Sequence, residues 1–299
     1  MPELPEVETV KRAIETAALS HQVAQVWQSG KKMRWPIPAD IDAALRGGTI
    51  TTARRRGKYI VLDIAAGGEA SPKLGSPKLS SPKLRSHGHS MIIHLGMSGS
   101  VRIYPHDKAP ERLTHDHLVI TTSHASGGVK LVLNDPRRFG GIQLVPLGED
   151  SAHPLLKGMG VEPLGNAMSG EMMKDAFHGK AAPIKTTLLD QKIIAGIGNI
   201  YASEALFLAG VSPKRKARNV SLAKCQDLAA AVRVVLEKAI AAGGTSLRDH
   251  VQPGGEIGYF VQQLNVYGRD GEPCPTCQQP IKMIRQTGRA SFYCSACQR

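Results

Sequence analysis

The chain has 299 residues, of which 38 are Lys or Arg and 25 are Asp or Glu, so its formal net charge is +13. Such a charge points to a polyanionic partner, either nucleic acid or an anionic membrane surface. No apolar run is long enough to span a bilayer, and the acidic start lacks a signal-peptide core, so we expect a cytoplasmic protein that binds nucleic acid and no membrane. Aromatic residues make up only 4% of the chain, which argues against a protein that stacks many single-stranded bases.

The first element that the sequence predicts is a helix over residues 5–19. Pro5 suits the first helical position, and Glu6 and Glu8 suit the positive end of the helix dipole. The apolar positions that recur at helical spacing are Val7, Val10, Ile14 and Ala17. We therefore expect this helix to bury one face.

Residues 22–147 follow a β pattern. Runs rich in Val and Ile alternate with Gly, Pro and Asp turns, and these runs are 59–64, 90–95, 117–122, 129–133 and 141–146. Short strands at this spacing predict a sandwich or barrel. Within this region, Ser-Pro-Lys-Leu occurs three times in residues 71–84, and its composition predicts an exposed, mobile loop. The repeat either adds basic contacts to DNA or is a tolerated insertion, and we favour the insertion.

The pattern turns helical from about residue 165 to residue 245. The core candidates are Leu206, Ala209, Leu222, Leu228, Val232, Val235 and Leu236. Cys225 falls in the same stretch, and we expect it to be a buried, small apolar residue. The change of pattern predicts a hinge near residues 150–160.

Four cysteines in two close pairs occur near the end of the chain: Cys274 with Cys277, and Cys294 with Cys297. This spacing predicts a tetrahedral sulfur site that holds one structural Zn²⁺ and leaves no position open for a catalytic water. The alternative of two disulfides is disfavoured, because no secretory signal precedes them.

Between the cysteine pairs, the sequence predicts a β-hairpin with strands at 281–284 and 291–293 around a turn at 287–288. The basic side chains that this hairpin carries are Lys282, Arg285 and Arg289. A basic hairpin on a rigid metal base is suited to contact phosphates.

The N-terminus offers a second kind of chemistry. Pro2 follows the initiator Met1 directly, and a small second residue permits removal of that methionine. A free N-terminal proline is a secondary amine, partly unprotonated at neutral pH, which can attack an electrophilic carbon and form an iminium. Glu3 and Glu6 lie close enough in sequence to move protons for it. On composition alone, an ordinary N-terminus remains the simpler interpretation.

Several motifs resemble those of the bacterial formamidopyrimidine-DNA glycosylases, which repair oxidised purines, and they occur in the same order. The similar segments are residues 1–10 (MPELPEVETV), 56–59 (RGKY), 94–99 (HLGMSG), 115–117 (HDH), 135–140 (DPRRFG), 196–205 (GIGNIYASEA) and the zinc hairpin. They span the chain in the family's order, whereas the Ser-Pro-Lys-Leu repeat departs from the family's usual pattern.

The resemblance implies an α+β fold. Its expected parts are an N-terminal helix with an antiparallel β-sandwich (1–150), a linker (151–164), a helix–two-turn–helix domain (165–269) and a four-cysteine zinc finger with a β-hairpin (270–299).

The resemblance also implies a monomer that acts on damaged double-stranded DNA, with a catalytic role for four residues. Pro2 would be the nucleophile at C1′ of the damaged nucleotide, and Glu3 would be the general acid and base. Lys58 would bind phosphate and act as an acid in β-elimination. Arg289 would hold the phosphates that flank the lesion and assist δ-elimination.

The other matched residues would contact DNA. Met97, Arg137 and Phe139 would fill the gap left by the flipped base, with Arg137 facing the orphaned cytosine. Further expected contacts are His94, His115, Lys180, Lys185 and Asn199, the last at a helix start where backbone N–H groups can bind a phosphate. Residues 245–260 match the family's lesion-reading loop in type.

The expected activity is therefore removal of 8-oxoguanine and formamidopyrimidines, followed by strand cleavage through β,δ-elimination. One rival is the endonuclease-VIII type, which prefers oxidised pyrimidines, but Leu4 and residues 135–139 favour the purine enzyme. A rival of another class is a non-catalytic zinc-ribbon DNA-binding protein, which a retained Met1 would favour.

Overall fold

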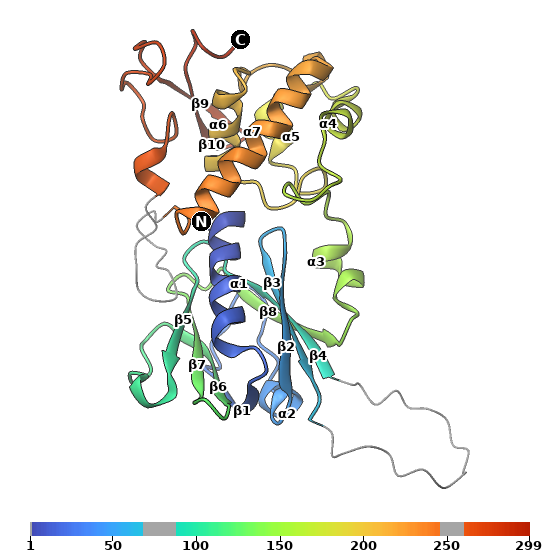
Figure 1. Cartoon of the computed structure of the whole chain (residues 1–299), viewed down its shortest axis with the longest axis vertical. Helices are drawn as coiled ribbons and strands as arrows, with labels where there is room; N and C mark the ends of the chain where they lie inside the picture. The colour runs from blue at the N-terminus through green and yellow to red at the C-terminus, as the bar shows by residue number, and fades with distance from the viewer. Residues whose placement is uncertain (1, 68–87, 246–259) are drawn as a thin grey trace, which may run out of the picture.

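A sheet-rich part and a helical part lie end to end along the long axis of the molecule (Figure 1). The computed structural model describes residues 2–67, 88–245 and 260–299. The first helix, α1 (Leu4–Ala18), begins at the junction of the two parts and runs along the sheets. The N-terminal residues are therefore placed between the two parts, where both can contact them.

The sheet-rich part contains eight antiparallel strands in the order β5-β7-β6-β1-β2-β3-β4-β8. Their bounds are β1 Gln22–Gln28, β2 Thr49–Arg56, β3 Tyr59–Ala65, β4 Gly88–His94, β5 Ser100–Pro105, β6 Asp116–Ser123, β7 Val129–Asn134 and β8 Gly141–Pro146. Strands β1 and β2 pair where Gln22 meets Thr49, and each then pairs along its length with another neighbour. The order thus divides into two four-stranded halves, whose apolar faces share one core. The expected antiparallel sheet is confirmed.

Helix α1 contributes to two cores. Val7, Val10 and Ile14 are buried with the strands, whereas Leu4 is buried among the helices of the second part. The helix begins and ends one residue earlier than the expected 5–19, and it buries Ala18 in place of the half-buried Ala17. A short helix, α2 (Ile41–Leu45), and a 3-10 turn, η1 (His106–Lys108), complete this part.

The helical part is built around α6 (Asn199–Leu208) and α7 (Leu222–Ala241). The elements between the sheets and α6 are η2 Asp150–Ala152, α3 Pro154–Lys157, α4 Gly170–Phe177 and α5 Ile184–Leu188. A 3-10 turn, η3 (Ala217–Asn219), lies between α6 and α7. Cys225 is buried in this core, as expected. Leu222 was expected in the core and is 42% exposed, because it begins α7, one turn before Cys225 starts the buried stripe.

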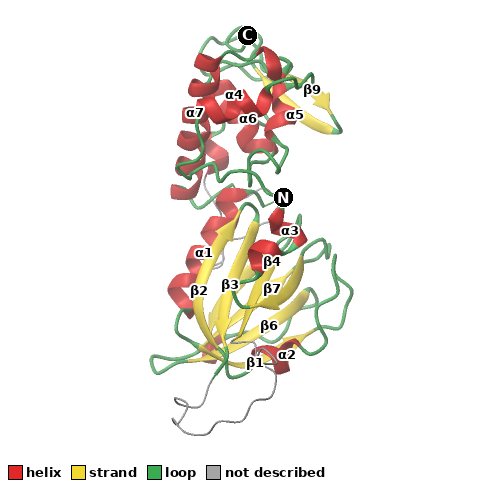
Figure 2. Ribbon diagram, turned by 90° about the vertical axis from the view of Figure 1, so that its right-hand side faces the viewer, coloured by secondary structure: helices red, strands yellow, loops and turns green. Residues whose placement is uncertain are grey.

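The C-terminal hairpin consists of β9 (Lys282–Gln286) and β10 (Arg289–Tyr293), and each strand is longer than the sequence pattern predicts. Thr287 and Gly288 both have positive φ, as two-residue hairpin turns that follow the strand twist require. The hairpin lies beside the α5 and α6 helices (Figure 2). A 3-10 turn, η4 (Phe260–Gln263), precedes it.

Two features expected from the sequence lie outside the described residues: the Ser-Pro-Lys-Leu repeat at 71–84 and nearly all of the expected lesion-reading loop at 245–260. Within the described parts of the chain, no helix has the length and apolar character needed to cross a bilayer.

Candidate active site

Four segments that are distant in sequence meet at the junction of the two parts. They are residues 2–4, the β2–β3 turn, the loop before α6 and the start of β10. The Leu4 N–H donates to the Gly196 carbonyl (3.2 Å), which joins the start of α1 to the loop before α6.

The Glu3 carboxylate lies at the N-terminal end of α6. Its Oε1 accepts the Ile200 N–H (3.2 Å), and Gly198 leaves the space for it, since a Cβ there would lie 2.1 Å from Glu3 Cδ. The positive end of the helix dipole favours a carboxylate at this position. Glu3 Oε2 is buried and has no hydrogen-bond partner within the described structure. This oxygen is therefore available to a substrate or a water.

A second carboxylate, Glu6, lies beside the first. Its Oε2 accepts the Glu3 N–H (2.8 Å), and its Oε1 accepts the Tyr201 hydroxyl and the Thr245 N–H (2.7 Å). Burial raises the pKa of Glu6 to about 7, with the Glu3 charge adding to the rise and the Tyr201 hydroxyl opposing it. Glu6 therefore links the start of α1 to Thr245.

Pro2 precedes this pair and is buried at the junction. Its nitrogen is a reactive secondary amine only if Met1 is removed. A buried amine beside a buried carboxylate has the arrangement that nucleophilic catalysis with proton transfer requires.

Lys58 is presented by the β2–β3 turn. Gly57 has φ +56°, a left-handed conformation that favours glycine. Burial lowers the pKa of the Lys58 ammonium, while the Glu3 carboxylate opposes the shift and Arg289 adds to it. Lys58, Glu3 and Arg289 thus form one electrostatic cluster.

Arg289 begins β10 and is exposed. Two residues expected on phosphates anchor the next part of its strand: Lys185 Nζ donates to the Ala290 carbonyl (2.7 Å) and to Ser291 Oγ (2.9 Å), and Asn199 Nδ2 donates to the same carbonyl (3.0 Å). Burial lowers the pKa of Lys185 to about 7, with Glu3 opposing the shift. Asn199 Oδ1 is buried without a partner within the described structure.

Met97, Arg137 and Phe139 lie together on the sheet-rich part. Met97 is 37% exposed and Phe139 45% exposed, and the Arg137 guanidinium lies 4.8 Å from the Phe139 ring centroid. Exposed apolar side chains beside a planar cation are suited to enter a base stack. The buried Asp135 fixes this loop, since it accepts the Ser98 hydroxyl (2.6 Å) and the Gly140 N–H (2.8 Å).

A cavity of about 350 Å³ adjoins these side chains. The residues that line it are Arg34, His94, Gly96, Met97 and Phe139. Burial lowers the pKa of His94 to about 4, helped by the charges of Arg34 and Lys58, so its ring is neutral at physiological pH. A larger cavity, about 610 Å³, is lined by residues of β1 and β5–β7 and of the 109–113 loop, and none of the expected site residues lines it.

The other two expected DNA contacts lie apart from the Glu3 cluster. His115 is exposed, and its carbonyl accepts the Asp135 N–H (2.9 Å), which places it beside the loop that carries Arg137. Lys180 is half-buried between α4 and α5, where its carbonyl accepts the Arg218 N–H (3.0 Å). No described contact joins either side chain to Glu3.

The four hairpin cysteines converge as expected. The ligand atoms of Cys274, Cys277, Cys294 and Cys297 all lie within 4.8 Å of one another. A tetrahedral Zn²⁺ with sulfur ligands at about 2.3 Å needs sulfurs spaced in this way, so the residues fit the metal. Val266 and Ile281 are buried against the cysteines, so the site is the core of the hairpin.

Two further carboxylates were not expected at the site: Glu204, which is buried, and Glu162, which is partly buried. Glu204 accepts hydrogen bonds from the backbone N–H groups of Asn265, Val266 and Tyr267, and also from Asn265 Nδ2 (2.8–2.9 Å). It is the only charged residue in the apolar helix α6, a signal that could have been noticed. Glu162 binds the β2–β3 turn and has no such signal in the sequence.

Family models match most of the chain. The formamidopyrimidine-DNA glycosylase N-terminal domain matches residues 1–142, the H2TH domain of the same enzymes matches residues 159–251, and the zinc finger found in FPG and IleRS matches residues 271–299.

Curated proteins and solved structures agree with these matches. Formamidopyrimidine-DNA glycosylases of Stenotrophomonas maltophilia and Jannaschia sp. are 45% and 42% identical, with the full length of both chains covered. The MutM (FPG) protein of Thermus thermophilus superposes with a TM-score of 0.79 at 33% identity, over 99% of this chain and 98% of that one. Lactococcus lactis Fpg bound to DNA that contains an abasic site superposes with a TM-score of 0.82 at 29% identity, over 99% of both chains.

Proposed function

The chain belongs to the formamidopyrimidine-DNA glycosylase family and is a base-excision-repair DNA glycosylase with lyase activity; from this premise we propose that it removes oxidised purines with Pro2 as its nucleophile. Oxidised purines are typical substrates of the family. A related structure, MutM, was solved with DNA that contains carbocyclic 8-oxo-G, and it superposes with a TM-score of 0.82 at 30% identity. Leu4 and residues 135–139 favour this activity over the endonuclease-VIII alternative.

The observation that carries the proposal is the environment of Glu3. Glu3 is a buried carboxylate with one oxygen that has no partner among the described residues. It is held at the start of α6 and adjacent to Pro2, so it supplies an acid and base next to a nucleophile. Buried carboxylate oxygens are normally hydrogen-bonded, so the oxygen without a partner supports a place for a substrate group.

In the proposed reaction, the Pro2 amine attacks C1′ of the damaged nucleotide and the base leaves. Glu3 acts as the general acid and base for base release and sugar ring opening. The resulting iminium makes the neighbouring sugar hydrogen acidic, which permits elimination. Lys58 lies in the same electrostatic cluster and would act as the acid in β-elimination. Arg289, exposed at the start of β10, would hold the phosphates and assist δ-elimination.

The damaged nucleotide must be flipped out of the base stack of the duplex, at a cost of a few kcal/mol. Met97, Arg137 and Phe139 would occupy the vacated space, with Arg137 reading the orphaned cytosine. His94, His115, Lys180, Lys185 and Asn199 would contribute further DNA contacts, although Lys185 and Asn199 also hold the hairpin strand that carries Arg289.

The metal has a structural role. Four cysteines hold one Zn²⁺ and fill all of its coordination positions. The metal in turn fixes the base of the hairpin. We further propose domain limits at residues 1–150, 165–269 and 270–299, a linker at 151–164, and action as a monomer in the cytoplasm.

The test uses duplexes that contain one 8-oxoguanine, or one thymine glycol as an oxidised pyrimidine, under single-turnover conditions. The proposal expects faster excision of 8-oxoguanine and strand ends that carry phosphate on both sides of the gap. Faster excision of thymine glycol would favour the endonuclease-VIII alternative. Tight binding without excision of either base would favour a non-catalytic zinc-ribbon protein.

A further inference from the structure

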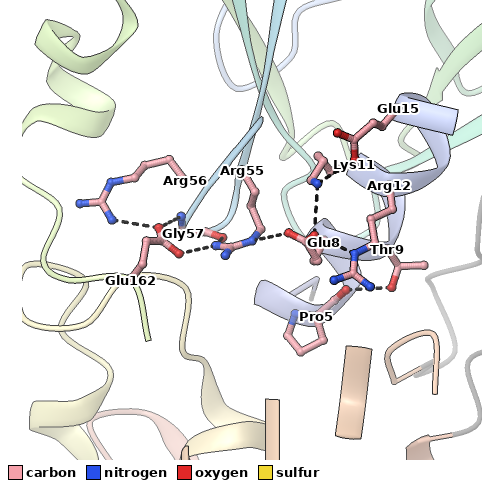
Figure 3. A network of polar contacts seen from close by, with 10 residues as sticks. All are labelled: Pro5, Glu8, Thr9, Lys11, Arg12, Glu15, Arg55, Arg56, Gly57 and Glu162. Atoms are coloured by element: carbon pink, nitrogen blue, oxygen red, sulfur yellow. Dashed lines mark hydrogen bonds and ion pairs between the residues drawn. The ribbon is translucent and has the colours of Figure 1, made fainter. Parts of the chain in front are cut away.

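The carboxylate of Glu162 is fully engaged by the residues that lead to Lys58. It accepts Arg55 Nη1 (2.6 Å), Arg56 Nη1 (2.9 Å) and the Gly57 N–H (2.7 Å), so its donors come from consecutive residues at the end of β2 and in the turn (Figure 3). Arg55 also donates to Glu8 of α1 (2.9 Å). The catalytic roles proposed above use none of these groups.

The chain before Glu162 wraps the same turn. Arg56 Nη2 donates to the carbonyls of Met159 (2.8 Å) and Gly160 (2.6 Å). The segment 159–162 is therefore bound to the β2–β3 turn through both its backbone and its carboxylate.

The same segment is bound on its other side to the loop before α6. Gly160 N–H donates to the Gln191 carbonyl (2.8 Å), and Val161 exchanges backbone hydrogen bonds with Ile193 (3.1 Å) and Ala195 (2.9 Å). That loop leads directly to the start of α6, where the Glu3 carboxylate lies. Residues 159–162 thus connect the turn that carries Lys58 to the loop that positions Glu3.

The Lys58 ammonium has no hydrogen bond or ion pair of its own within the described structure, so its place depends on the turn beneath it. From these contacts, we propose that Glu162 is a positioning residue that holds Lys58 against Glu3 for the lyase steps. This inference rests on the proposed role of Lys58. A misplacement of about 1 Å in such a group reduces rates by up to about a hundredfold.

A purely structural role makes a different prediction. The side chains of Arg55 and Glu162 are 10% and 26% exposed, and loss of one partner from a part-buried ion pair destabilises the fold in either case. The melting temperature therefore does not separate the two roles, whereas a double-mutant cycle between Glu162 and Lys58 does.

The experiment measures strand cleavage at a preformed abasic site in duplex DNA, with saturating enzyme and a single turnover, for the wild type, Glu162→Gln, Lys58→Ala and the double variant. Gln keeps the shape of Glu162 and removes its charge. We expect Glu162→Gln to slow cleavage about tenfold or more in the wild-type background, and less than about twofold when Lys58 is already Ala.

Asp150→Asn is the matched control. Asp150 is buried and accepts Arg54 Nη1 (3.2 Å) and Nη2 (3.1 Å), so it pairs with a β2 arginine as the partly buried Glu162 does. Arg54 is the residue before Arg55. We expect it to change the cleavage rate less than about twofold.

Three outcomes would overturn the inference. An equal slowing by Glu162→Gln in both backgrounds would show a general structural role and leave the proposed role of Lys58 intact. If Asp150→Asn slowed cleavage as much as Glu162→Gln does, the effect of Glu162→Gln would also be a general structural one. Unchanged cleavage in Lys58→Ala would remove the proposed role of Lys58, and the positioning role of Glu162 with it.

Discussion

The Glu3 carboxylate occupies the space that a side chain at Gly198 would need. A Cβ on Gly198 would lie 2.1 Å from Glu3 Cδ and 2.3 Å from Oε1. Gly198 has φ −128°, which any residue adopts, so the requirement for glycine comes from this close approach and not from the backbone angle. The start of α6 is thus shaped to receive a carboxylate from α1.

Gly198→Ala should therefore displace Glu3 and slow excision of 8-oxoguanine about a hundredfold, because the acid and base would no longer lie beside Pro2. The measurement is the single-turnover excision rate at saturating enzyme. Gly158→Ala is the control, since Gly158 has φ −100° and nothing within 4 Å of its Cβ position. If Gly198→Ala keeps the wild-type rate, the Glu3 position is not catalytic.

Glu6 should make the protein less stable as pH rises. Its pKa in the folded state is raised from 4.5 to about 7, so the folded protein binds more protons than the unfolded chain between these values. The stabilisation by protonated Glu6 is complete below pH 4.5 and is lost by about pH 7, a change of roughly 3 kcal/mol.

The measurement is the difference in unfolding free energy between wild type and Glu6→Gln, taken by denaturant titration from pH 4.5 to 7.5. Other titrating groups, such as His94, cancel in this difference. Glu15→Gln, on the same helix with a side chain 43% exposed, is the control. A pH-independent difference for Glu6→Gln would contradict the account.

Removal of the metal should weaken DNA binding and stability together. Cys294→Ser breaks the sulfur cluster at the base of the hairpin, so Arg289 loses its rigid support. Zinc content should fall from one per chain, and the dissociation constant for every duplex should rise. Cys225→Ser is the control, because Cys225 is buried in the helical core outside the cluster and should leave one zinc bound.

Arg137 and Arg289 should differ in what they contribute to binding. Arg289→Ala should lower the affinity for all duplexes and reduce the salt slope by about one unit, since a phosphate contact carries little sequence information. Arg137→Ala should instead reduce the preference for cytosine over adenine opposite 8-oxoguanine by about 1–3 kcal/mol. Excision from both pairs at two salt concentrations separates the effects. An Arg137→Ala enzyme with its full cytosine preference would show that another residue reads the orphaned base.

Local patterns predicted most of the elements. Helix α1, strands β3, β4, β6, β7 and β8, and the zinc hairpin follow from periodicity, turn residues and cysteine spacing, which act over a few neighbouring residues. No individual run was named for β1, β2 or β5. The core prediction for Leu222 was wrong, because periodicity does not show where a helix leaves its packing partner.

Contacts between distant segments could not be predicted in this way. Three contacts join residues more than a hundred positions apart: Glu3 packs against Gly198, Lys185 donates to Ala290 of the hairpin, and Glu162 accepts the Gly57 N–H. Lys185 illustrates the limit most clearly. The family resemblance implied a DNA contact for Lys185, and the structure adds that its ammonium is buried and donates to two groups of β10.

The central claim is that the amine of Pro2 forms the covalent intermediate, and borohydride trapping tests it most directly. Enzyme and duplex DNA with one 8-oxoguanine are mixed with borohydride, and the cross-linked peptide is identified by mass spectrometry. We expect an adduct on a peptide that begins with Pro2 and lacks Met1, and we expect Pro2→Gly to trap far less DNA. Full-strength trapping in Pro2→Gly, with the adduct on Lys58, would contradict the account.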